Sequence, residues 1–377
     1  MRRYPHLIRP VWVEVDLAAI GHNVREIRRL VGPRPKILAA VKAEAYGHGA
    51  IPVARAALAA GAEWLGVALP EEGIALRDAG LAAPILVMSP LQADQAEVFL
   101  AYGLTPTVCQ REPVSALSAL AASTGRHCGV HLKVDTGMGR IGIEPVEALS
   151  FASWLSHLPG VSLTGVYSHL ARADEEDKTS ALEQVRAFQR VCAALIASGI
   201  EPGLCHLANS AAIIDLPQAH FDMVRAGIML YGLRPSAEVD LSRVDLRPAF
   251  SLHARISFLK RIPAGTGLSY GHIYRTRAPA TIATLPLGYA DGFSRLLSGK
   301  ASALIRGRRY PVVGRICMDQ CLVDLGDDPA EIGDEAVLIG RQDGAEITAD
   351  EVAERLGTIN YEVTCMIGDR VPRVFRE

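Results

Sequence analysis

The sequence predicts an α/β fold in which an N-terminal (β/α)8 barrel of the TIM type is followed by a mainly-β domain. Through about residue 240, apolar or β-branched runs alternate with helical patterns, a rhythm typical of a barrel of parallel strands. Beyond that residue the helical periodicity fades, and short alternating segments separated by glycine and proline turns follow. No GxGxxG motif follows the first apolar run of the barrel, which disfavours a dinucleotide-binding sheet. We therefore expect two domains, residues 1–240 and 241–377.

The barrel half is predicted to start with a helix over residues 16–31, which Asp16 can cap. The apolar face of this helix has residues at helical spacing: Leu17, Ile20, Val24, Ile27 and Val31. Eight strands are then expected at 37–42, 64–69, 84–89, 105–108, 130–135, 161–168, 204–207 and 221–224. Helical patterns separate most of them, at 50–60, 71–80, 91–102, 112–124, 145–157 and 178–198.

The pattern of the second half of the sequence predicts short strands and one clear helix. Alternating segments cover residues 250–262, 279–290, 301–307, 308–316, 320–325 and 335–340. A helix is expected within residues 347–357, where Thr348 is the cap and Glu351, three residues on, completes a capping box. This pattern favours a barrel or a sandwich of β-strands.

The composition excludes several classes of function. The chain has 377 residues and a formal net charge of −2, and it has no basic run longer than Arg308-Arg309, so a small-molecule partner is expected rather than nucleic acid. It has no stretch of 18 apolar residues, so no membrane helix is expected, and residues 1–16 lack the apolar core of a signal peptide. The seven cysteines form no CxxC pair, which indicates free thiols in a reducing cytoplasm and no metal site.

The predicted strand ends carry many cationic or imidazole side chains. In barrels of this type the chemistry lies at the C-terminal ends of the strands. Taken singly, such a lysine usually lies at a solvated strand end, and such a histidine is usually a hydrogen-bonded structural residue. Together, however, this many cationic side chains at one barrel mouth should hold an anion. The residues concerned are Lys42, Lys133, Arg140, His169, His206 and Arg225, with Asp135 as the one acid close by.

Phosphate is the natural anion for such a site. Barrel phosphate sites use the loops after strands seven and eight, where Ser210 opens a helix and Gly227 permits close approach of the backbone. A lysine that loses its proton easily, such as Lys42, is a Schiff-base candidate. These features suggest pyridoxal phosphate, and a phosphorylated sugar or an aldolase substrate competes with it. Spacing alone does not separate the two.

Specific motifs narrow this choice. The chain contains, in order, VKAEAYGHG, KVDTGMGRIG, YSHLARAD, CHLANSAA, VRAGIMLYG, LSYGHIY, LGYADGFSR, GRICMDQ and YEVTC. With these motifs the chain resembles the alanine racemases over nearly its whole length. The resemblance implies a cytoplasmic homodimer that interconverts L-alanine and D-alanine with pyridoxal 5′-phosphate and supplies D-alanine for peptidoglycan. It implies the same barrel and C-terminal β domain that the pattern predicts.

The resemblance also implies roles for individual residues. Lys42 would carry the cofactor, and Arg225, supported by His206, would face its pyridine nitrogen. Arg140 would contact the phenolic oxygen of the cofactor and the substrate, and Lys133 occupies a position that is often carbamylated in the family. The cofactor phosphate would be held by Tyr46, Ser210, Gly227, Ile228 and Tyr361.

Racemisation needs a proton-transfer group on each face of the reacting carbon. By resemblance these groups are Lys42 and Tyr270, with His169 hydrogen-bonded to the tyrosine. Tyr270 would act on the barrel of the other subunit, so that the homodimer shares its sites. Asp319 would support the chemistry, and the backbone N–H of Met318 would contact the substrate carboxylate. An access corridor would be lined by Asp174, Tyr289, Arg295, Arg315 and Tyr361.

Two positions depart from the family pattern, and three other functions stay open. Glu44 stands where the family often has Asn, and Ala226 stands where Pro is frequent. The alternatives are a broader or serine-specific racemase, a non-catalytic cofactor-binding barrel protein, and a Schiff-base aldolase that needs no pyridoxal. Tyr270 argues against the non-catalytic protein, and the corridor tyrosines argue against the broader racemase.

Overall fold

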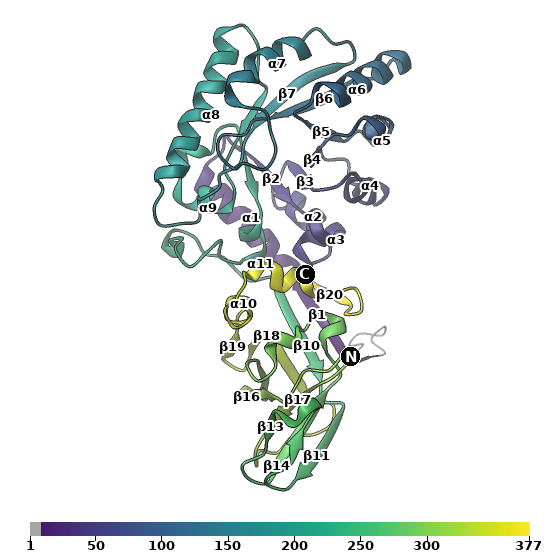
Figure 1. Ribbon diagram of the computed structural model, residues 1–377, viewed down its shortest axis with the longest axis vertical. Coiled ribbons are helices and arrows are strands. Elements are labelled where there is room, and N and C mark those ends of the chain that lie inside the picture. The colour runs from purple at the N-terminus through teal and green to yellow at the C-terminus, as the bar shows by residue number, and fades with distance from the viewer. Residues whose placement is uncertain (1–8) are drawn as a thin grey trace. The chain divides into compact units, whose positions relative to one another are not determined.

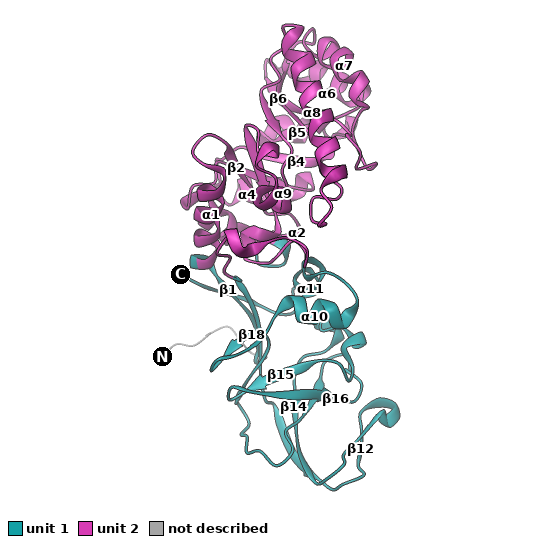
Figure 2. Ribbon diagram, turned by 90° about the vertical axis from the view of Figure 1, so that its left-hand side faces the viewer, with its two compact units in different colours: residues 1–18, 46–49, 248–377 teal, residues 19–45, 50–247 magenta. Residues whose placement is uncertain are grey.

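The computed structural model describes residues 9–377 (Figure 1). The chain forms two compact units, coloured separately in Figure 2. The barrel unit comprises residues 19–45 and 50–247, and the β unit comprises the residues up to 18 together with 46–49 and 248–377. The expectation about a signal peptide concerns residues 1–16, of which 1–8 lie outside the described part of the chain.

The barrel unit is a closed ring of eight parallel strands, which confirms the predicted fold class. The ring closes where β2 pairs with β9, with Leu38 opposite Arg225 and Ala39 opposite Ala226. Each strand falls on one of the predicted apolar runs. The strands are β2 (Lys36–Ala40), β3 (Trp64–Val67), β4 (Ile85–Pro90), β5 (Thr105–Val108), β6 (Cys128–Lys133), β7 (Val161–Tyr167), β8 (Leu204–His206) and β9 (Met223–Ala226).

One helix precedes the first strand of the barrel, and the other helices separate successive strands. On α1, Ile20, Val24 and Ile27 are fully buried at helical spacing, as predicted. Asp16 stands directly before α1, at the position expected of a capping residue. The helices are α1 (Leu17–Val31), α3 (Ala50–Ala59), α4 (Pro70–Asp78), α5 (Ala96–Tyr102), α6 (Arg111–Thr124), α7 (Ala148–Leu155), α8 (Thr179–Ala197) and α9 (Ser210–Asp215).

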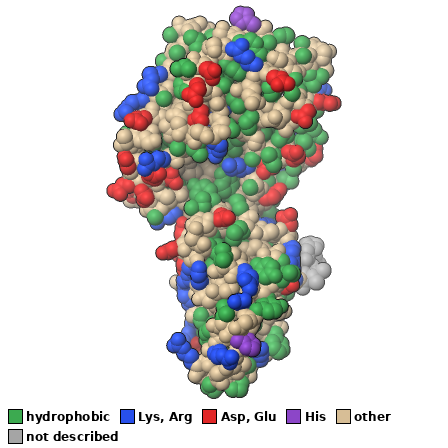
Figure 3. Space-filling view, viewed as in Figure 1, with side chains coloured by type: hydrophobic (Ala, Val, Ile, Leu, Met, Phe, Trp, Pro, Cys, Tyr) green, Lys and Arg blue, Asp and Glu red, His purple; other side chains and the backbone are tan. Residues whose placement is uncertain are grey.

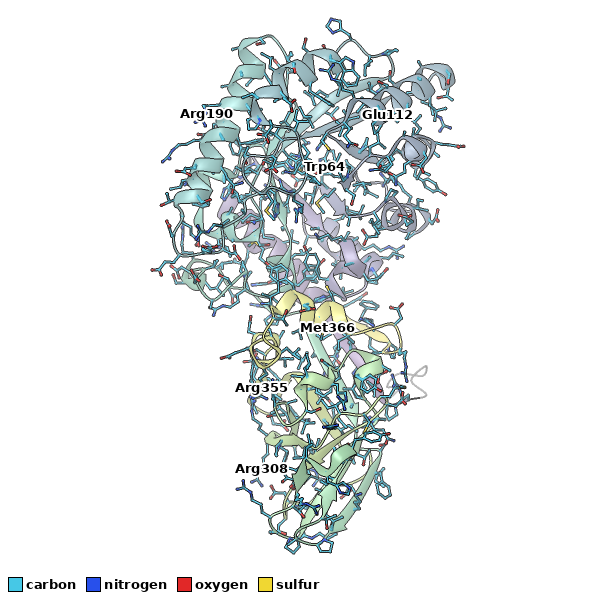
Figure 4. All side chains as sticks on the ribbon, viewed as in Figure 1. Trp64, Glu112, Arg190, Arg308, Arg355 and Met366 are labelled. Atoms are coloured by element: carbon cyan, nitrogen blue, oxygen red, sulfur yellow. The ribbon has the colours of Figure 1, made fainter. Side chains whose placement is uncertain are left out.

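The barrel interior is partly polar. Trp64 projects from β3, as labelled in Figure 4, and its ring centroid lies 5.3 Å from that of His131 on β6. Because these two strands are not neighbours in the ring, the contact runs through the interior. Thr107 on β5 shares a hydrogen bond of 2.7 Å with the hydroxyl of Tyr167 on β7 and donates one of 2.7 Å to the Val87 carbonyl. The interior is therefore filled by side chains that fix one another's orientation.

The β unit is built mainly of β-strands, as predicted, and most of these pair in antiparallel fashion. One sheet runs in the order β11-β14-β17-β16-β15-β18-β10-β1-β20, with β19 paired to β18 and a separate hairpin of β12 and β13. Its strands are β1 (Val11–Asp16), β10 (Phe250–Arg255), β11 (Phe258–Ile262), β12 (Gly267–Leu268), β13 (Tyr274–Arg275), β14 (Ala280–Leu285), β15 (Ser302–Ile305), β16 (Arg308–Val313), β17 (Cys321–Asp324), β18 (Glu335–Gln342), β19 (Ala345–Ile347) and β20 (Arg373–Arg376).

Two helices belong to the β unit, α10 (Ala349–Leu356) and α11 (Asn360–Met366). The Thr348 hydroxyl accepts a hydrogen bond of 3.0 Å from the Glu351 N–H, which confirms Thr348 as the predicted cap. The Glu351 carboxylate pairs with Arg309 and Arg355 and so does not act as the expected capping-box partner. β1 lay outside the predicted strands, although VWVEVD alternates as a strand does. It pairs with β10 on one side and β20 on the other.

The surface carries both signs of charge. On the face drawn in Figure 3, basic and acidic side chains occur on both units. Within residues 9–377 no helix is long and apolar enough to cross a membrane. The same residues contain no group of three or more His, Cys, Asp or Glu side chains arranged to hold a metal ion.

Candidate active site

Lys42 opens an unusual turn directly after β2. α2 (Lys42–Tyr46) is left-handed, with φ between 51° and 54° at Ala43, Glu44, Ala45 and Tyr46. Each non-glycine residue in this conformation costs about 1–2 kcal/mol, so four in succession need support from their surroundings. Part of that support is local, because the Ala45 N–H donates to the Val41 carbonyl at 2.9 Å. The turn holds the half-exposed Lys42 at the C-terminal end of the strand.

Arg225, at the end of β9, is a fixed and buried cation. Its Nη2 donates to the carbonyls of Ser168 at 2.7 Å and Leu207 at 3.0 Å. Its Nη1 donates to Nδ1 of His206 at 3.0 Å. Burial lowers the pKa of Arg225 to about 10, so the guanidinium stays charged at neutral pH. Within residues 9–377, its Nε makes no hydrogen bond and is available to a ligand.

The histidines around Arg225 form a polarised chain. Because the guanidinium can only donate, His206 accepts at Nδ1 and carries its proton on Nε2, which then donates to Nδ1 of His131 at 3.0 Å. Burial, followed by the charge of Arg225, lowers the pKa of His131 to about 3 and that of His206 well below its usual range. The ring of Tyr167 stacks on His206 with centroids 4.7 Å apart. Both histidines are therefore neutral at physiological pH.

His169 is a third histidine in contact with the Arg225 guanidinium. Its Nδ1 accepts from Nη2 of Arg225 at 3.1 Å, which leaves the proton on Nε2. Burial and then the cations Arg225, Arg140, Lys133 and Lys42 lower the pKa of His169 well below its usual range. His169 is thus a neutral hydrogen-bond donor at Nε2, and Lys42 lies within electrostatic range of it.

Lys133 is the most deeply buried lysine of the site. Its side chain is only 2% exposed, and Nζ lies 5.1 Å from the ring centre of Tyr167. Burial and the charge of Arg225 lower the pKa of Lys133 to about 7, against the opposing effect of Asp135. Arg140 contributes a smaller repulsion and is itself exposed. A large fraction of this amine is therefore uncharged at neutral pH.

The loops after β8 and β9 are tied together by Ser210. The Ser210 hydroxyl accepts from the N–H groups of Gly227 at 3.0 Å and Met229 at 3.3 Å. Asn209 caps α9 by accepting from the Ala212 N–H at 3.1 Å. Ile228 begins the short helix η4 (Ile228–Tyr231) in this same corner. Asp174 lies apart from it, in the loop between β7 and α8, where its carbonyl accepts from Ser236.

The β unit gathers a second set of predicted residues. Tyr270 opens the turn η6 (Tyr270–His272) and follows Ser269, whose φ of 59° and ψ of −171° are rare outside glycine. The Ser269 hydroxyl donates to the Arg315 carbonyl at 2.6 Å, which ties the Tyr270 turn to the Arg315 strand end. The Tyr270 side chain is 68% exposed.

The neighbouring loops of the β unit bring in Tyr289, Met318 and Asp319. The Tyr289 N–H donates to the Cys317 carbonyl at 3.0 Å, and the Ala290 N–H donates to that of Met318 at 3.0 Å. Asp319 pairs with Arg370 at 2.7 Å. Arg295 begins the turn η8 (Arg295–Leu297).

Tyr46 and Tyr361 also lie together in the β unit. Their ring centroids are 6.1 Å apart, and burial raises the pKa of Tyr46. The backbone after Tyr46 is tightly seated, because a Cβ at Gly47 would lie 2.2 Å from the Thr364 carbonyl oxygen. Glycine is required at this approach.

The sequence interpretation missed several residues of the site. His131 and Tyr167 complete the Arg225 network, and the alternation of β6 gives a signal for His131, which lies two residues from Lys133 and so on the same face. Glu72 was also missed, although its carboxylate accepts from the backbone beside Lys42. No local pattern marks Glu72, because it is distant in sequence from the lysine.

The fold and site define an enzyme built from a (β/α)8 barrel with a lysine at its mouth and a mainly-β unit. The family model for the alanine racemase N-terminal domain matches residues 15–235, and that for the alanine racemase C-terminal domain matches residues 249–375. The chain belongs to the alanine racemase family, and its enzyme class is that of an alanine racemase. This confirms the resemblance drawn from the motifs.

Relatives match over nearly their full length. An alanine racemase of Desulfovibrio desulfuricans is 50% identical over 98% of this chain and 99% of that protein, and one of Desulforamulus reducens is 49% identical over 97% and 99%. A solved alanine racemase of Clostridium difficile 630 matches with a TM-score of 0.93 at 40% identity, covering 98% of this chain and 96% of that one. The Bacillus anthracis alanine racemase with bound L-Ala-P matches with a TM-score of 0.92 at 41% identity over 98% and 95%.

Proposed function

We propose that this chain interconverts L-alanine and D-alanine with pyridoxal 5′-phosphate, using Lys42 and Tyr270 as the two proton-transfer groups. The observation that carries the proposal is the pairing of a half-exposed lysine at the end of β2 with the buried cation Arg225 at the end of β9, the strand next to it. An amine for attachment and an arginine as partner of the pyridine nitrogen are two features by which proteins hold this cofactor.

The residues present fit the cofactor. The unengaged Nε of Arg225 suits a ring nitrogen that accepts a hydrogen bond, and the Ser210, Gly227 and Ile228 corner suits a phosphate group. Tyr46 and Tyr361 are proposed to complete the phosphate site, with Lys42 carrying the group. When bound, pyridoxal phosphate disperses the negative charge left on the substrate Cα after a proton is removed.

The two proposed bases would act on opposite faces of the substrate Cα. Lys42 would take or return the Cα proton on one side, and Tyr270 on the other, because racemisation requires a proton to leave one face and arrive on the opposite one. The neutral His169, with its proton on Nε2, would donate to the Tyr270 oxygen and favour its anionic form. Arg140 and the Met318 N–H would bind the substrate carboxylate, and Asp319 would support them.

A shared homodimer site accounts for the exposure of the catalytic tyrosine. Tyr270 is 68% exposed, Met318 53% and Tyr289 40%, which would leave the chemistry open to water in a single chain. We infer that the β unit of a second copy covers the barrel mouth and supplies these residues there. Asp174, Tyr289, Arg295, Arg315 and Tyr361 would line the access corridor. The product D-alanine would serve peptidoglycan synthesis in the cytoplasm.

The test is circular dichroism of purified protein loaded with pyridoxal phosphate and mixed with L-alanine. We expect the signal to decay to zero, with the same end point from D-alanine, and to stay constant with a Tyr270→Phe variant. If the signal of the unaltered protein stays constant with alanine but decays with L-serine or L-lysine, the substrate is that other amino acid and not alanine. Full activity of Tyr270→Phe would remove the tyrosine from the mechanism.

A further inference from the structure

We infer that Glu72 is a positioning residue for Lys42, an inference that rests on the proposed function of that lysine. Glu72 lies in the first turn of α4, and one of its carboxylate oxygens, Oε1, accepts from the Ala43 N–H at 2.6 Å. Ala43 is the residue directly after Lys42 and the first of the four left-handed residues.

The two oxygens of Glu72 do different work. Oε2 accepts from the N–H groups of Ala68 at 2.7 Å and Leu69 at 3.0 Å, which is the glutamate half of a capping box at the start of α4. Oε1 leaves its own helix and reaches the backbone beside Lys42. A cap needs only the first of these contacts, so the second is an added function of the side chain.

Lys42 is thereby held between two anchored peptide groups. On one side, the Val41 N–H donates to the Gly66 carbonyl of β3 at 2.8 Å. On the other side, the Ala43 N–H donates to Glu72. Both anchors belong to the segment formed by β3 and the start of α4, so the backbone of Lys42 is fixed relative to the next strand of the barrel.

The left-handed turn makes this anchor necessary. Four consecutive residues with positive φ are individually disfavoured, and the first N–H of any helical turn has no partner within the turn. A carboxylate at that N–H satisfies the orphan donor with a strong, charge-assisted bond. Without it, the turn would relax toward ordinary conformations and the lysine would lose its direction.

The Glu72→Gln variant separates the two functions. Glutamine serves a capping box as well as glutamate does, so its oxygen can keep the contacts to Ala68 and Leu69 while its amide NH2 faces the Ala43 N–H and cannot accept from it. Glu72→Ala removes both contacts. Glu71→Gln is the matched control, because Glu71 is an exposed glutamate on the same first turn.

Three measurements test the inference. The first is the rate at which added pyridoxal phosphate attaches to apo-protein, followed by absorbance near ~420 nm and located at Lys42 by borohydride reduction and mass analysis. The second is the division of any loss between kcat and KM for alanine. The third is amide hydrogen exchange in the peptide containing residues 41–46, which needs neither cofactor nor activity.

We expect Glu72→Gln to attach the cofactor at least ~10-fold more slowly, to lower kcat at least ~10-fold with KM within ~2-fold, and to exchange its 41–46 amides faster. Glu71→Gln should match the unaltered protein within ~2-fold in each measurement. Unchanged attachment and exchange in both Glu72→Gln and Glu72→Ala would overturn the inference, and if Glu72→Ala does not fold, unchanged values in Glu72→Gln and Glu72→Asp would do so. Failure of the unaltered protein to racemise alanine would count against the proposed function alone, since attachment and exchange are read independently.

Discussion

His131 and His206, which are buried inside the barrel, are neutral at physiological pH, and this shapes how the barrel responds to acid. Both are fully buried, with folded pKa values far below the ordinary value of about 6.5. As the pH falls below ~6.5, the unfolded chain gains protons that the folded barrel does not take up. Their contribution to stability is therefore present above that pH and is lost progressively below it.

The lowered pKa values of these two histidines predict that the free energy of unfolding depends measurably on pH. Each such histidine should lower the free energy of unfolding by about 1.4 kcal/mol per pH unit below ~6.5. Replacing His131 by Gln should remove the contribution of that residue, and urea unfolding of the apo-protein at several pH values between ~5 and ~7 checks this. The control is His157→Gln, which alters an exposed histidine. Equal slopes for His131→Gln and the unaltered protein would mean that His131 is protonated in the folded barrel.

Lys133 predicts a reaction with carbon dioxide. Its pKa of about 7 means that the amine loses its charge as the pH rises through that value, and an uncharged amine adds CO2 to give a carbamate and a proton. Arg140 and Arg225 favour the negative product. We expect 13C-labelled bicarbonate to give a carbamate carbonyl signal that grows with pH.

The carbamate signal should disappear in Lys133→Met and persist in Lys36→Met, which changes an exposed lysine. A signal that survives in Lys133→Met would assign the carbamate elsewhere.

Residues of this kind show the limit of prediction from sequence. The strand ends indicated Lys133, but its contact with the Tyr167 ring on the neighbouring strand β7, and the hydrogen bond that joins Tyr167 to Thr107 on β5, have no sequence pattern.

At the scale of elements, the barrel strands could be predicted because each is a short apolar run bounded by polar or turn residues. The left-handed turn after Lys42 could not. The residues AEAY favour an ordinary right-handed helix or a loop, and only glycine or asparagine would have signalled a positive φ. The conformation is imposed by contacts with other elements, including that of Glu72.

A glycine pair after α8 gives a prediction at this scale. Gly203 precedes β8, which carries His206, and a Cβ there would lie 2.2 Å from the Thr164 carbonyl oxygen. Gly199 also has positive φ, but its Cβ would meet nothing within 4 Å. Gly199→Ala should cost about 1 kcal/mol of conformational strain, and Gly203→Ala at least ~2 kcal/mol more because the backbone must move. Thermal unfolding compares them, and equal losses would show that β7 yields easily at Thr164.

At the scale of the whole molecule, the shared-site proposal predicts complementation between two inactive variants. Lys42→Ala and Tyr270→Phe each remove one base. In a mixed dimer, one site would have lost both bases and the other would be intact, if Tyr270 acts on the partner. Equal mixtures that exchange subunits freely should recover about a quarter of full activity.

The control is each variant alone, incubated identically, which should remain inactive. No recovery on mixing, despite subunit exchange demonstrated with a labelled chain, would mean that Lys42 and Tyr270 act within one chain.

The sequence could suggest this arrangement only through the resemblance, because neither composition nor periodicity says which chain a distant residue serves. The same is true of β1, whose partners β10 and β20 follow the barrel in the chain.

The pairing of β1 has a consequence for the order in which the protein is made. Residues 11–16 leave the ribosome before the barrel, yet β10 begins at Phe250 and β20 at Arg373. Every barrel strand has been synthesised by Ala226, so the barrel can close while β1 is still an unpaired apolar strand. Its partner β10 is complete at Arg255, but the edge of β1 that pairs with β20 stays open until Arg376, more than a hundred residues beyond the barrel. A nascent chain stalled just after the barrel exposes Trp12 and the valines of β1, and it is therefore the form of this protein most in need of a chaperone.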